Sequence, residues 1–410
     1  MKTLSINSNE VKQWRSSILI PEASDSRECF EKYSSKSFGS GMFFIPNTGK
    51  YNQAVAVLYE KFSPSEMKVG IAKFEELIVP IMLRYNDGNE MIDLGEVLDK
   101  MPIQDFHVLL PIYNIQITDD VIRIGGYSVV KYQYIADYFK SIGITMRGEY
   151  TQDPYFNYVP FVDFVITGRD NSWAMEKAKA ERSLLINYLN MMLFSNIRGI
   201  DVISETTDAG SSNRSFIGTL TSFSVSMSTS HPMVKRFDIG EAKDWLNREE
   251  NGSRKMLAVC KTNGGSELEK RVVNAINWVG MAVAEKNNAI AITQATYAVE
   301  SLLQNQIQGE PISKSIVASI GEMVAFLLGN NYDSRKQWEK QFKETYGLRS
   351  KVAHGKGQDI TNDQVLTAIG IAYELITTIV TKPQFKEAKT IQAINNYVEK
   401  MRYTYSEEEQ

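Results

Sequence analysis

Cysteine and histidine are scarce in this chain of 410 residues, which contains two cysteines and three histidines. Cys29 and Cys260 are too few and too far apart in the sequence for the disulfide framework of a small secreted protein. His107 and His231 have no cysteine, histidine or carboxylate neighbours at metal-ligand spacing. We therefore expect no metal site and no bound cofactor.

Several motifs and segment types are also missing. No GxxxxGK[ST] phosphate-binding loop occurs, which excludes the common class of nucleotide hydrolases that depends on it. The first fourteen residues lack the apolar core of a signal peptide. No uninterrupted apolar run approaches the length of a membrane span. These absences predict a cytoplasmic protein that does not enter a membrane.

The composition is that of a globular protein with sizeable cores, since 43% of residues are apolar, 23% are charged and the net charge is −4. The length suggests two or three domains. We predict the fold class α+β, with a mixed α/β amino-terminal region over residues 1–255, divisible into two subdomains, and an all-α bundle over residues 262–402. The polar stretch 251–265 contains NGS and NGG and is the best candidate for a linker.

Strand-like and helical patterns alternate in the amino-terminal region. Residues 106–117 and 121–132 resemble a pair of strands joined at Asp119 and Asp120. Further along we expect a buried strand at 159–168, a long helix at 172–193, another strand at 216–228 and a short helix within 237–250. Aromatic residues near the buried strand could stack bases or hold a peptide, but a packed strand edge explains them better; they are Tyr150, Tyr155, Phe156, Tyr158, Phe161 and Phe164.

The last third of the chain is patterned almost entirely as amphipathic helices. Apolar residues recur at helical spacing in successive segments within residues 268–283, 292–307, 316–328, 338–346, 366–376 and 391–398. Thr361 and Gln364 form a capping-box pattern at the start of one helix, and Asp333 or Ser334 could cap another. Such helices with short connections are typical of an antiparallel bundle.

One arginine and one histidine stand out near the end of the predicted helix at 338–346. Arg349 lies eleven residues after Trp338, about three helical turns, and therefore on the same stripe as Trp338 and Phe342. An arginine on an apolar stripe must be paired or must face a polar surface, because an isolated buried guanidinium is very costly. His354 follows five positions later. A permanent cation beside a group that titrates near neutrality suits phosphate chemistry.

This part of the chain resembles the Apea-like branch of the HEPN superfamily. The resemblance depends on YAVESLL (297–303), on YGLRSKVAHGKG (346–357) and on the order of the helices around them. HEPN domains carry an arginine, four to six residues and then a histidine; Arg349 and His354 occupy these places. Many active members have Asn, Asp or His directly after the arginine, where this chain has Ser350. A related branch is modified on a tyrosine two residues after the histidine, a position that Lys356 occupies here.

The resemblance implies an all-α HEPN-like bundle that acts as a metal-independent endoribonuclease, often a bacterial toxin or antiphage effector that works by abortive infection. It implies Arg349 and His354 as catalytic residues, RNA as substrate, and a homodimer or higher oligomer in which two motifs share one site. The amino-terminal region would then sense a phage-derived trigger or hold the nuclease inactive. The residues fit this chemistry independently, since imidazole suits proton transfer and guanidinium suits charge stabilisation on phosphate.

Residues around the motif supply supporting candidates. We interpret Ser350, Lys351, Lys356 and Glu300 as supporting or RNA-binding positions, with Glu300 better explained as an ion-pair partner than as a catalytic acid. Seven cations and three acids between residues 333 and 356 form a local basic strip, which is either an RNA-binding surface or a solvated helix face. The cations are Arg335, Lys336, Lys340, Lys343, Arg349, Lys351 and Lys356; the acids are Asp333, Glu339 and Glu344.

Two other interpretations remain open. Arg349 and His354 could be a structural pair that satisfies the end of the helix. In that case the bundle would be a non-catalytic module that dimerises or binds a nucleotide, while the amino-terminal region binds the partner. The bundle is also richer in apolar helix faces than a single-layer domain could bury, most clearly at 321–329. This surplus favours a homodimer through the bundle, but the amino-terminal region could cover it instead.

Overall fold

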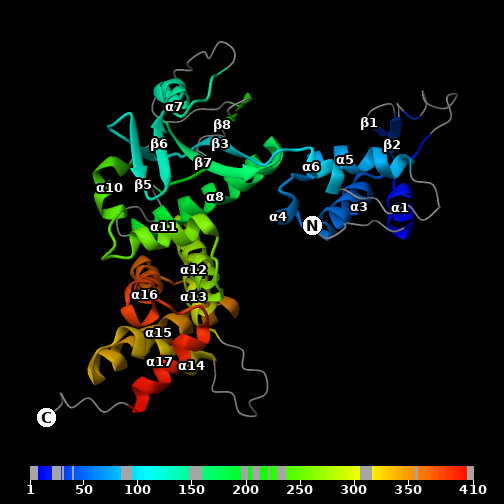
Figure 1. Ribbon diagram of the computed structural model, residues 1–410. Helices are drawn as coiled ribbons and strands as arrows, with labels where there is room; N and C mark the ends of the chain where they lie inside the picture. Colours follow the sequence, from blue (N-terminus) through cyan, green and yellow to red (C-terminus); the bar gives the residue numbers. More distant parts are fainter. Residues whose placement is uncertain are drawn as a thin grey trace. The chain divides into compact units, whose positions relative to one another are not determined.

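The computed structural model describes residues 8–20, 29, 32–38, 41–84, 95–146, 159–194, 202–205, 213–219, 222–228, 237–304, 316–355 and 359–403. The protein is α+β: among the described residues, strands occur only as far as Asp238, and the elements after that point are helices (Figure 1). It divides into two compact units, of which unit 1 contains residues 1–108, 164–179 and 216–224, and unit 2 contains residues 109–163, 180–215 and 225–410.

Unit 1 contains a small cluster of helices beside a β-hairpin. Trp14, Phe43 and Tyr51 form its aromatic centre, with ring centroids 5.8 Å apart for Trp14–Phe43 and for Phe43–Tyr51. Glu75 accepts hydrogen bonds from Lys36 and from the Tyr51 hydroxyl, so its charge is neutralised at the edge of this core. The elements are α1 (Ser8–Arg15), β1 (Ser34–Phe38), β2 (Gly41–Ile45), α3 (Thr48–Lys61), α4 (Pro64–Met67), α5 (Ile71–Arg84) and α6 (Gly95–Asp99).

The main sheet has six strands in the order β5-β6-β7-β3-β8-β9. Their bounds are β3 (Gln104–Pro111), β5 (Val121–Ile124), β6 (Tyr127–Lys131), β7 (Pro160–Gly168), β8 (Asn213–Gly218) and β9 (Phe223–Ser228). β5 and β6 pair in antiparallel fashion, as do β6 and β7. A separate short pair joins β4 (Ile115–Gln116) to β10 (Phe237–Asp238) in parallel.

Two strand predictions were wrong. Segments 106–117 and 121–132 do not pair across Asp119–Asp120; the hairpin instead lies inside the second segment, because Gly125, at φ 55°, forms the turn between β5 and β6 with Gly126. The predicted strand at 216–228 is two strands, β8 and β9, that lie side by side in the sheet.

Within the aromatic cluster, Phe161 and Phe164 are buried as expected. Tyr150, Tyr155, Phe156 and Tyr158 lie outside the described residues.

The helices expected in this region are present. They are α8 (Asn171–Met192) and α10 (Ile239–Leu246), and the structure adds η1 (Tyr132–Tyr134) and α7 (Ile135–Ser141). The predicted strand at 159–168 is β7, whose first five residues are all buried.

The predicted linker at 251–265 is a helix, α11 (Ser253–Thr262), which buries Met256, Leu257 and Cys260. The glycine and asparagine residues at the two ends of this helix explain why the sequence was interpreted as a linker. Gly252 at φ 72° begins the helix, and Asn263 at φ 53° ends it, so these residues are caps and not signs of a flexible segment. The domain border predicted between residues 255 and 262 lies within this helix. Independent folding on its two sides stays a prediction.

The carboxy-terminal helices follow the predicted stripes. They are α12 (Glu267–Ala284), α13 (Asn288–Leu303), α14 (Ile316–Leu328), α15 (Tyr332–Ala353), α16 (Asn362–Thr381), η3 (Pro383–Phe385) and α17 (Ile391–Tyr403). Thr361 and Gln364 form the predicted capping box reciprocally. Ile307 and Pro311, expected near the end of one helix and the start of the next, fall outside the described residues.

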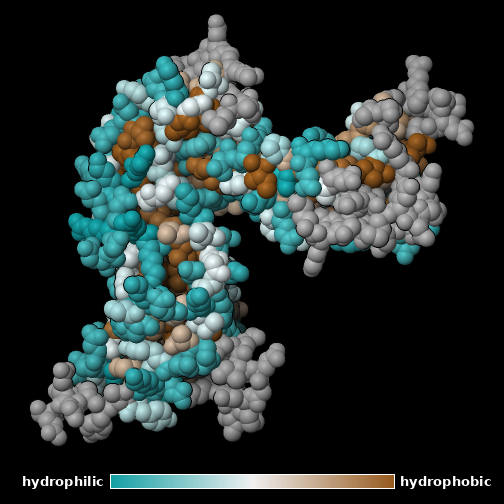
Figure 2. Space-filling model, viewed as in Figure 1, coloured by the Kyte–Doolittle hydropathy of each residue, from teal (hydrophilic) through white to brown (hydrophobic). Residues whose placement is uncertain are grey.

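α13 and α16 are the central helices of this bundle, since they contact each other and each also contacts α12, α14 and α15. By length and composition α16 is the one described helix that could cross a membrane, but half of the relevant stretch is buried inside the bundle. The apolar stretch at 321–329 lies in α14, where Met323, Val324 and Leu327 are buried. Hydrophilic residues cover most of the face of the bundle seen in Figure 2.

Candidate functional site

Helix α15 carries the predicted site, and its first turn is fixed by a capping box. The Asn331 side chain accepts from the Ser334 N–H at 2.9 Å, and the Ser334 hydroxyl oxygen accepts from the Asn331 N–H at 3.0 Å. The prediction that Asp333 or Ser334 is the N-cap was wrong: Asn331 is the N-cap, and Ser334 completes the box from the third helical position.

One face of α15 packs on the bundle and leads to Arg349. Phe342 is 1% exposed and Thr345 is 6% exposed, whereas Trp338 is half-buried. Arg349 continues this face, and its side chain retains 25% exposure. Because α15 contacts α13, the guanidinium lies against residues of that helix.

Three side chains surround the Arg349 guanidinium. Glu300 of α13 forms an ion pair with it, with 3.8 Å between Nη2 and Oε2. The guanidinium carbon lies 5.2 Å from the ring centroid of Tyr297 and 5.3 Å from that of Tyr346. Arg349 Nη1 also donates a long hydrogen bond of 3.4 Å to the Tyr346 hydroxyl. We name these four residues, Arg349, Glu300, Tyr297 and Tyr346, the Arg349 cluster.

The electrostatics of the cluster keep Arg349 charged. Desolvation alone would lower its pKa, but Glu300 and the two tyrosine hydroxyls more than compensate, and the pKa of Arg349 is raised. Burial, and then the nearby Glu300 carboxylate, raise the pKa of Tyr346. Tyr346 is thus a neutral partner of a fixed cation. The cluster continues to α12, because the Trp278 ring meets Tyr297 edge-on at 5.3 Å.

His354 is placed on the same helix end, but outside the cluster. It is the C-cap of α15, its backbone N–H donates to the Ser350 carbonyl at 3.2 Å, and its side chain is exposed. Gly355 at φ 72° follows and turns the chain away. In the part of the chain that the structure describes, the imidazole has no hydrogen-bond or ion-pair partner. The structure therefore pairs Arg349 with Glu300 and places the exposed His354 side chain outside that pair.

The other predicted positions differ in their surroundings. Ser350 is half-buried, and Lys351 is exposed. Lys356 lies outside the described residues. Much of the basic strip is locally engaged: Lys343 pairs with Glu339 at 2.5 Å, and Lys340 with Glu344 at 3.9 Å. These exposed pairs one helical turn apart are typical of a solvated helix face.

Sequence reasoning missed two members of the cluster. Tyr346 precedes Arg349 by three positions, so helical spacing alone could have placed it beside the guanidinium. Tyr297 had a weaker signal, since it lies in the YAVESLL segment but on another helix. No pattern within one segment reports which residues of two packed helices will meet.

The described residues offer little support for a metal site or for a reactive thiol. Within them, no group of three or more His, Cys, Asp or Glu is placed to hold a metal ion. Burial raises the pKa of the Cys260 thiol to about 12, which keeps it protonated and unreactive near neutral pH.

No family model, no curated protein and no solved structure matches this chain. The geometry of its own residues therefore carries the functional argument.

Proposed function

We propose that the helices α12–α17 form a HEPN-type, metal-independent endoribonuclease domain with Arg349 and His354 as catalytic residues. The observation that carries the proposal is the arrangement at the end of α15: a fixed, charged and partly exposed guanidinium lies five residues before an exposed histidine. The motif YGLRSKVAHGKG adds the resemblance in sequence.

The proposed reaction uses the 2'-hydroxyl of RNA as the nucleophile. That oxygen attacks the adjacent phosphorus, the bond to the 5'-oxygen breaks, and a 2',3'-cyclic phosphate forms. His354 moves a proton, either from the nucleophile or to the leaving oxygen, which is a task suited to imidazole near neutral pH. Arg349 stabilises the negative charge that develops on the phosphate oxygens.

A fixed guanidinium is useful for such a role because it needs no reorganisation during the reaction. Glu300 and the two tyrosines hold Arg349 in place, while its 25% exposure leaves donors for a phosphate. Ser350, Lys351 and Lys356 would contact RNA near the motif. A homodimer or higher oligomer would bring two motifs together, so that each chain supplies one histidine to a shared site.

The biological setting is part of the same proposal. A cytoplasmic ribonuclease that must not damage its own cell needs restraint, and the amino-terminal region would supply it until a phage-derived trigger releases the nuclease. The released nuclease would then act as a toxin on its own cell, which is the mechanism of abortive infection.

A second function is favoured by a specific observation. The guanidinium already has an anionic partner in Glu300 and two aromatic faces, which is the arrangement of a structural cation. On this alternative the bundle is a non-catalytic dimerisation or nucleotide-binding module, and its partner binds elsewhere.

Product chemistry separates the two functions. Purified full-length protein is incubated with RNA in the presence of EDTA, and the new ends are identified by mass spectrometry. The proposal predicts cleavage that survives chelation and leaves 2',3'-cyclic or 3'-phosphate ends. Cleavage that stops in EDTA and returns with added Mg²⁺ contradicts the mechanism. An absence of cleavage by correctly folded protein supports the interaction module.

A further inference from the structure

A row of aromatic rings runs from the core of the bundle, past Arg349, to the ring of Trp278. Phe342 and Tyr346 of α15 form its inner end, with ring centroids 6.0 Å apart. The Arg349 guanidinium lies between Tyr346 and Tyr297, and the Trp278 ring of α12 meets Tyr297 at 5.3 Å. Phe342 is buried, whereas Trp278 is only half-buried. The row therefore has one end in the core and one end that reaches the surface.

The indole of Trp278 has surface to offer to a ligand. Its contact with Tyr297 is edge-on, at an interplanar angle of 62°, so Tyr297 covers at most one face of the indole. Among the described residues the indole N–H has no hydrogen-bond partner, and its nitrogen is not buried. Met281, three residues further along the same face of α12, is 42% exposed. This face of α12 is thus open to solvent around Trp278.

The indole lies close enough to Arg349 for one RNA strand to contact both. Trp278 and the guanidinium carbon lie 5.3 Å and 5.2 Å from the same Tyr297 ring, so their separation cannot exceed these two distances together. A phosphate and a base of neighbouring nucleotides in an extended strand can span such a separation. Proteins that bind single strands combine cations for the backbone with aromatic rings for the bases in this way.

We propose that Trp278 is a base-stacking residue of the Arg349 site, on which an unpaired base stacks while a phosphate of the same strand binds Arg349. The base must be unpaired, because bases in an A-form duplex are stacked inside the helix, whereas those of single strands and loops can turn out onto a ring. Single-stranded RNA is then the substrate class. The inference rests on the proposed function, since it takes RNA to be the ligand of Arg349.

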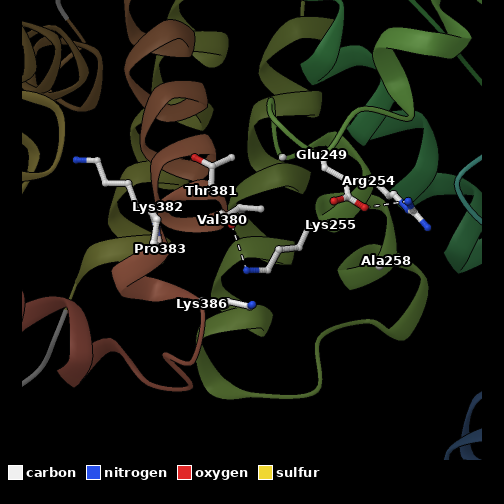
Figure 3. Close-up of a pocket in the computed structure, with 10 residues that line it drawn as sticks. Glu249, Arg254, Lys255, Ala258, Val380, Thr381, Lys382, Pro383 and Lys386 are labelled. Carbon is white, nitrogen blue, oxygen red and sulfur yellow. Dashed lines mark hydrogen bonds and ion pairs between the residues drawn. The ribbon is translucent and has the colours of Figure 1, made fainter.

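A second basic surface of unit 2 is the rival place for RNA. It is a pocket of about 650 Å³ between α11 and the end of α16 (Figure 3). Lys255 and Lys382 donate there to the carbonyls of Val380 and Leu327, which explains both as cations at helix ends. None of the described residues that line the pocket is aromatic, so it offers charge but no ring for a base. Lys386, an exposed lysine of this pocket, provides the control for charge alone.

The test measures binding without cleavage. A fluorescently labelled strand of 2'-O-methyl uridine, which lacks the free 2'-hydroxyl of the proposed reaction, is titrated with full-length protein and followed by anisotropy. A strand of the same length and charge with abasic sites in place of the bases is titrated in parallel, and so is the duplex. We expect the wild type to bind the strand with bases about tenfold more tightly than either the abasic strand or the duplex, the effect of stacking one base.

Trp278→Leu removes the aromatic ring but keeps an apolar side chain. This variant should bind the strand with bases about tenfold more weakly than the wild type does, and should no longer distinguish it from the abasic strand. Trp278→Phe retains a ring and should recover part of the loss. The matched control is Trp245→Leu, at a half-buried tryptophan of α10 outside the row, which should bind both strands as the wild type does. Lys386→Ala should lower the affinity for either strand by less than about twofold.

Fluorescence gives a second measurement that does not depend on the leucine variant being folded. The strand with bases should quench tryptophan emission of the wild type, the abasic strand should not, and Trp278→Phe should lose this quenching. Equal quenching of Trp278→Phe and the wild type would contradict the stacking.

Other results would also overturn the proposal. The first is equal affinity of the wild type for the two strands, or no binding of either. The second is a folded Trp278→Leu that distinguishes the strands as the wild type does, or a larger loss in Lys386→Ala than in Trp278→Leu. The third is dissociation of an oligomer by Trp278→Leu in sedimentation, which would place the indole between two copies of the chain.

Cleavage is assayed separately, so the two proposals fail in different ways. A protein that stacks a base on Trp278 but cuts no RNA would lose the proposed reaction and keep this residue. A protein that cuts RNA and is indifferent to Trp278 would keep the reaction and lose the stacking.

Discussion

Replacing Arg349 by alanine is expected to destabilise the bundle by about 2 kcal/mol, because the guanidinium is the common partner of Glu300, Tyr297 and Tyr346. Each cation–π contact contributes about 0.5–1 kcal/mol at a partly exposed position. The ion pair adds about 0.2–1 kcal/mol at most, since its 3.8 Å separation and partial exposure weaken it. The hydrogen bond to Tyr346 is too long, at 3.4 Å, to add much.

The Glu300 carboxylate that remains after the substitution adds to the loss of stability. Glu300 is only 14% exposed, so without Arg349 its carboxylate stays largely desolvated and has lost its cation. Breaking a fully buried pair costs about 3–5 kcal/mol, and the partial exposure of Arg349 keeps the expected value below that range. Arg349→Lys retains the charge but loses the planar contact with both rings, so we expect about half of the effect.

Urea unfolding followed by tryptophan fluorescence is a suitable assay, because Trp278 contacts Tyr297 and Trp338 lies on α15. A protein of two units need not unfold in one step, so the transition of the bundle must be resolved first. A double-mutant cycle of Arg349→Ala with Glu300→Gln then isolates the coupling between the two side chains.

Lys351→Ala is the matched control, since this exposed cation lies two residues further along the same helix. Its stability should stay within about 0.5 kcal/mol of the wild type. The reasoning is refuted if Arg349→Ala is as stable as Lys351→Ala, or if the cycle gives no coupling between Arg349 and Glu300.

Two further predictions concern stability. Burial raises the pKa of the Glu181 carboxyl in the folded protein. The protonated carboxyl therefore contributes to stability below the unfolded-state pKa, and this contribution is lost as the pH rises through the folded-state pKa. Glu181→Gln should therefore be more stable than the wild type at neutral pH, with the advantage fading below about pH 4, as thermal melts across pH will show; a constant difference would contradict this. Gly280→Ala should destabilise by about 2 kcal/mol or more, because the added Cβ would lie 2.3 Å from the backbone of Asn187, whereas Gly347→Ala, with nothing within 4 Å, should stabilise by about 0.5–1 kcal/mol. Equal melting temperatures for these two glycine variants would show that Gly280 does not lie as close to the Asn187 backbone as the structure places it.

The sequence predicts the helical bundle well because each helix carries its own evidence. The stripes of α12 and α16 repeat at helical spacing, and Thr361 with Gln364 marks a helix start within four residues. The N-cap of α15 was missed because Asn331 and Asp333 are both good capping residues, and only the reciprocal bond from Ser334 distinguishes them.

The errors arise where one residue type has two meanings. Glycine and asparagine around α11 are the caps of a helix, but the same residues are common in linkers. Gly125 and Gly126 turn the chain inside what resembles one strand. Only part of the Arg349 cluster could be predicted from the sequence. The position of Tyr346 follows from local helical spacing, whereas the contacts of Tyr297 and Glu300 depend on how α13 packs on α15.

RNA cleavage by His354→Ala tests the central claim most directly. The side chain is exposed and caps α15 only through its backbone, so the variant should fold and melt like the wild type. The account predicts that this variant cuts RNA at least about a hundredfold more slowly, the lower end of what a general acid or base contributes. Lys389→Ala, at an exposed position outside the motif and the basic strip, should retain more than half of the activity. A correctly folded His354→Ala protein that cleaves RNA at the wild-type rate would contradict the assignment of this histidine and, with it, the proposed mechanism.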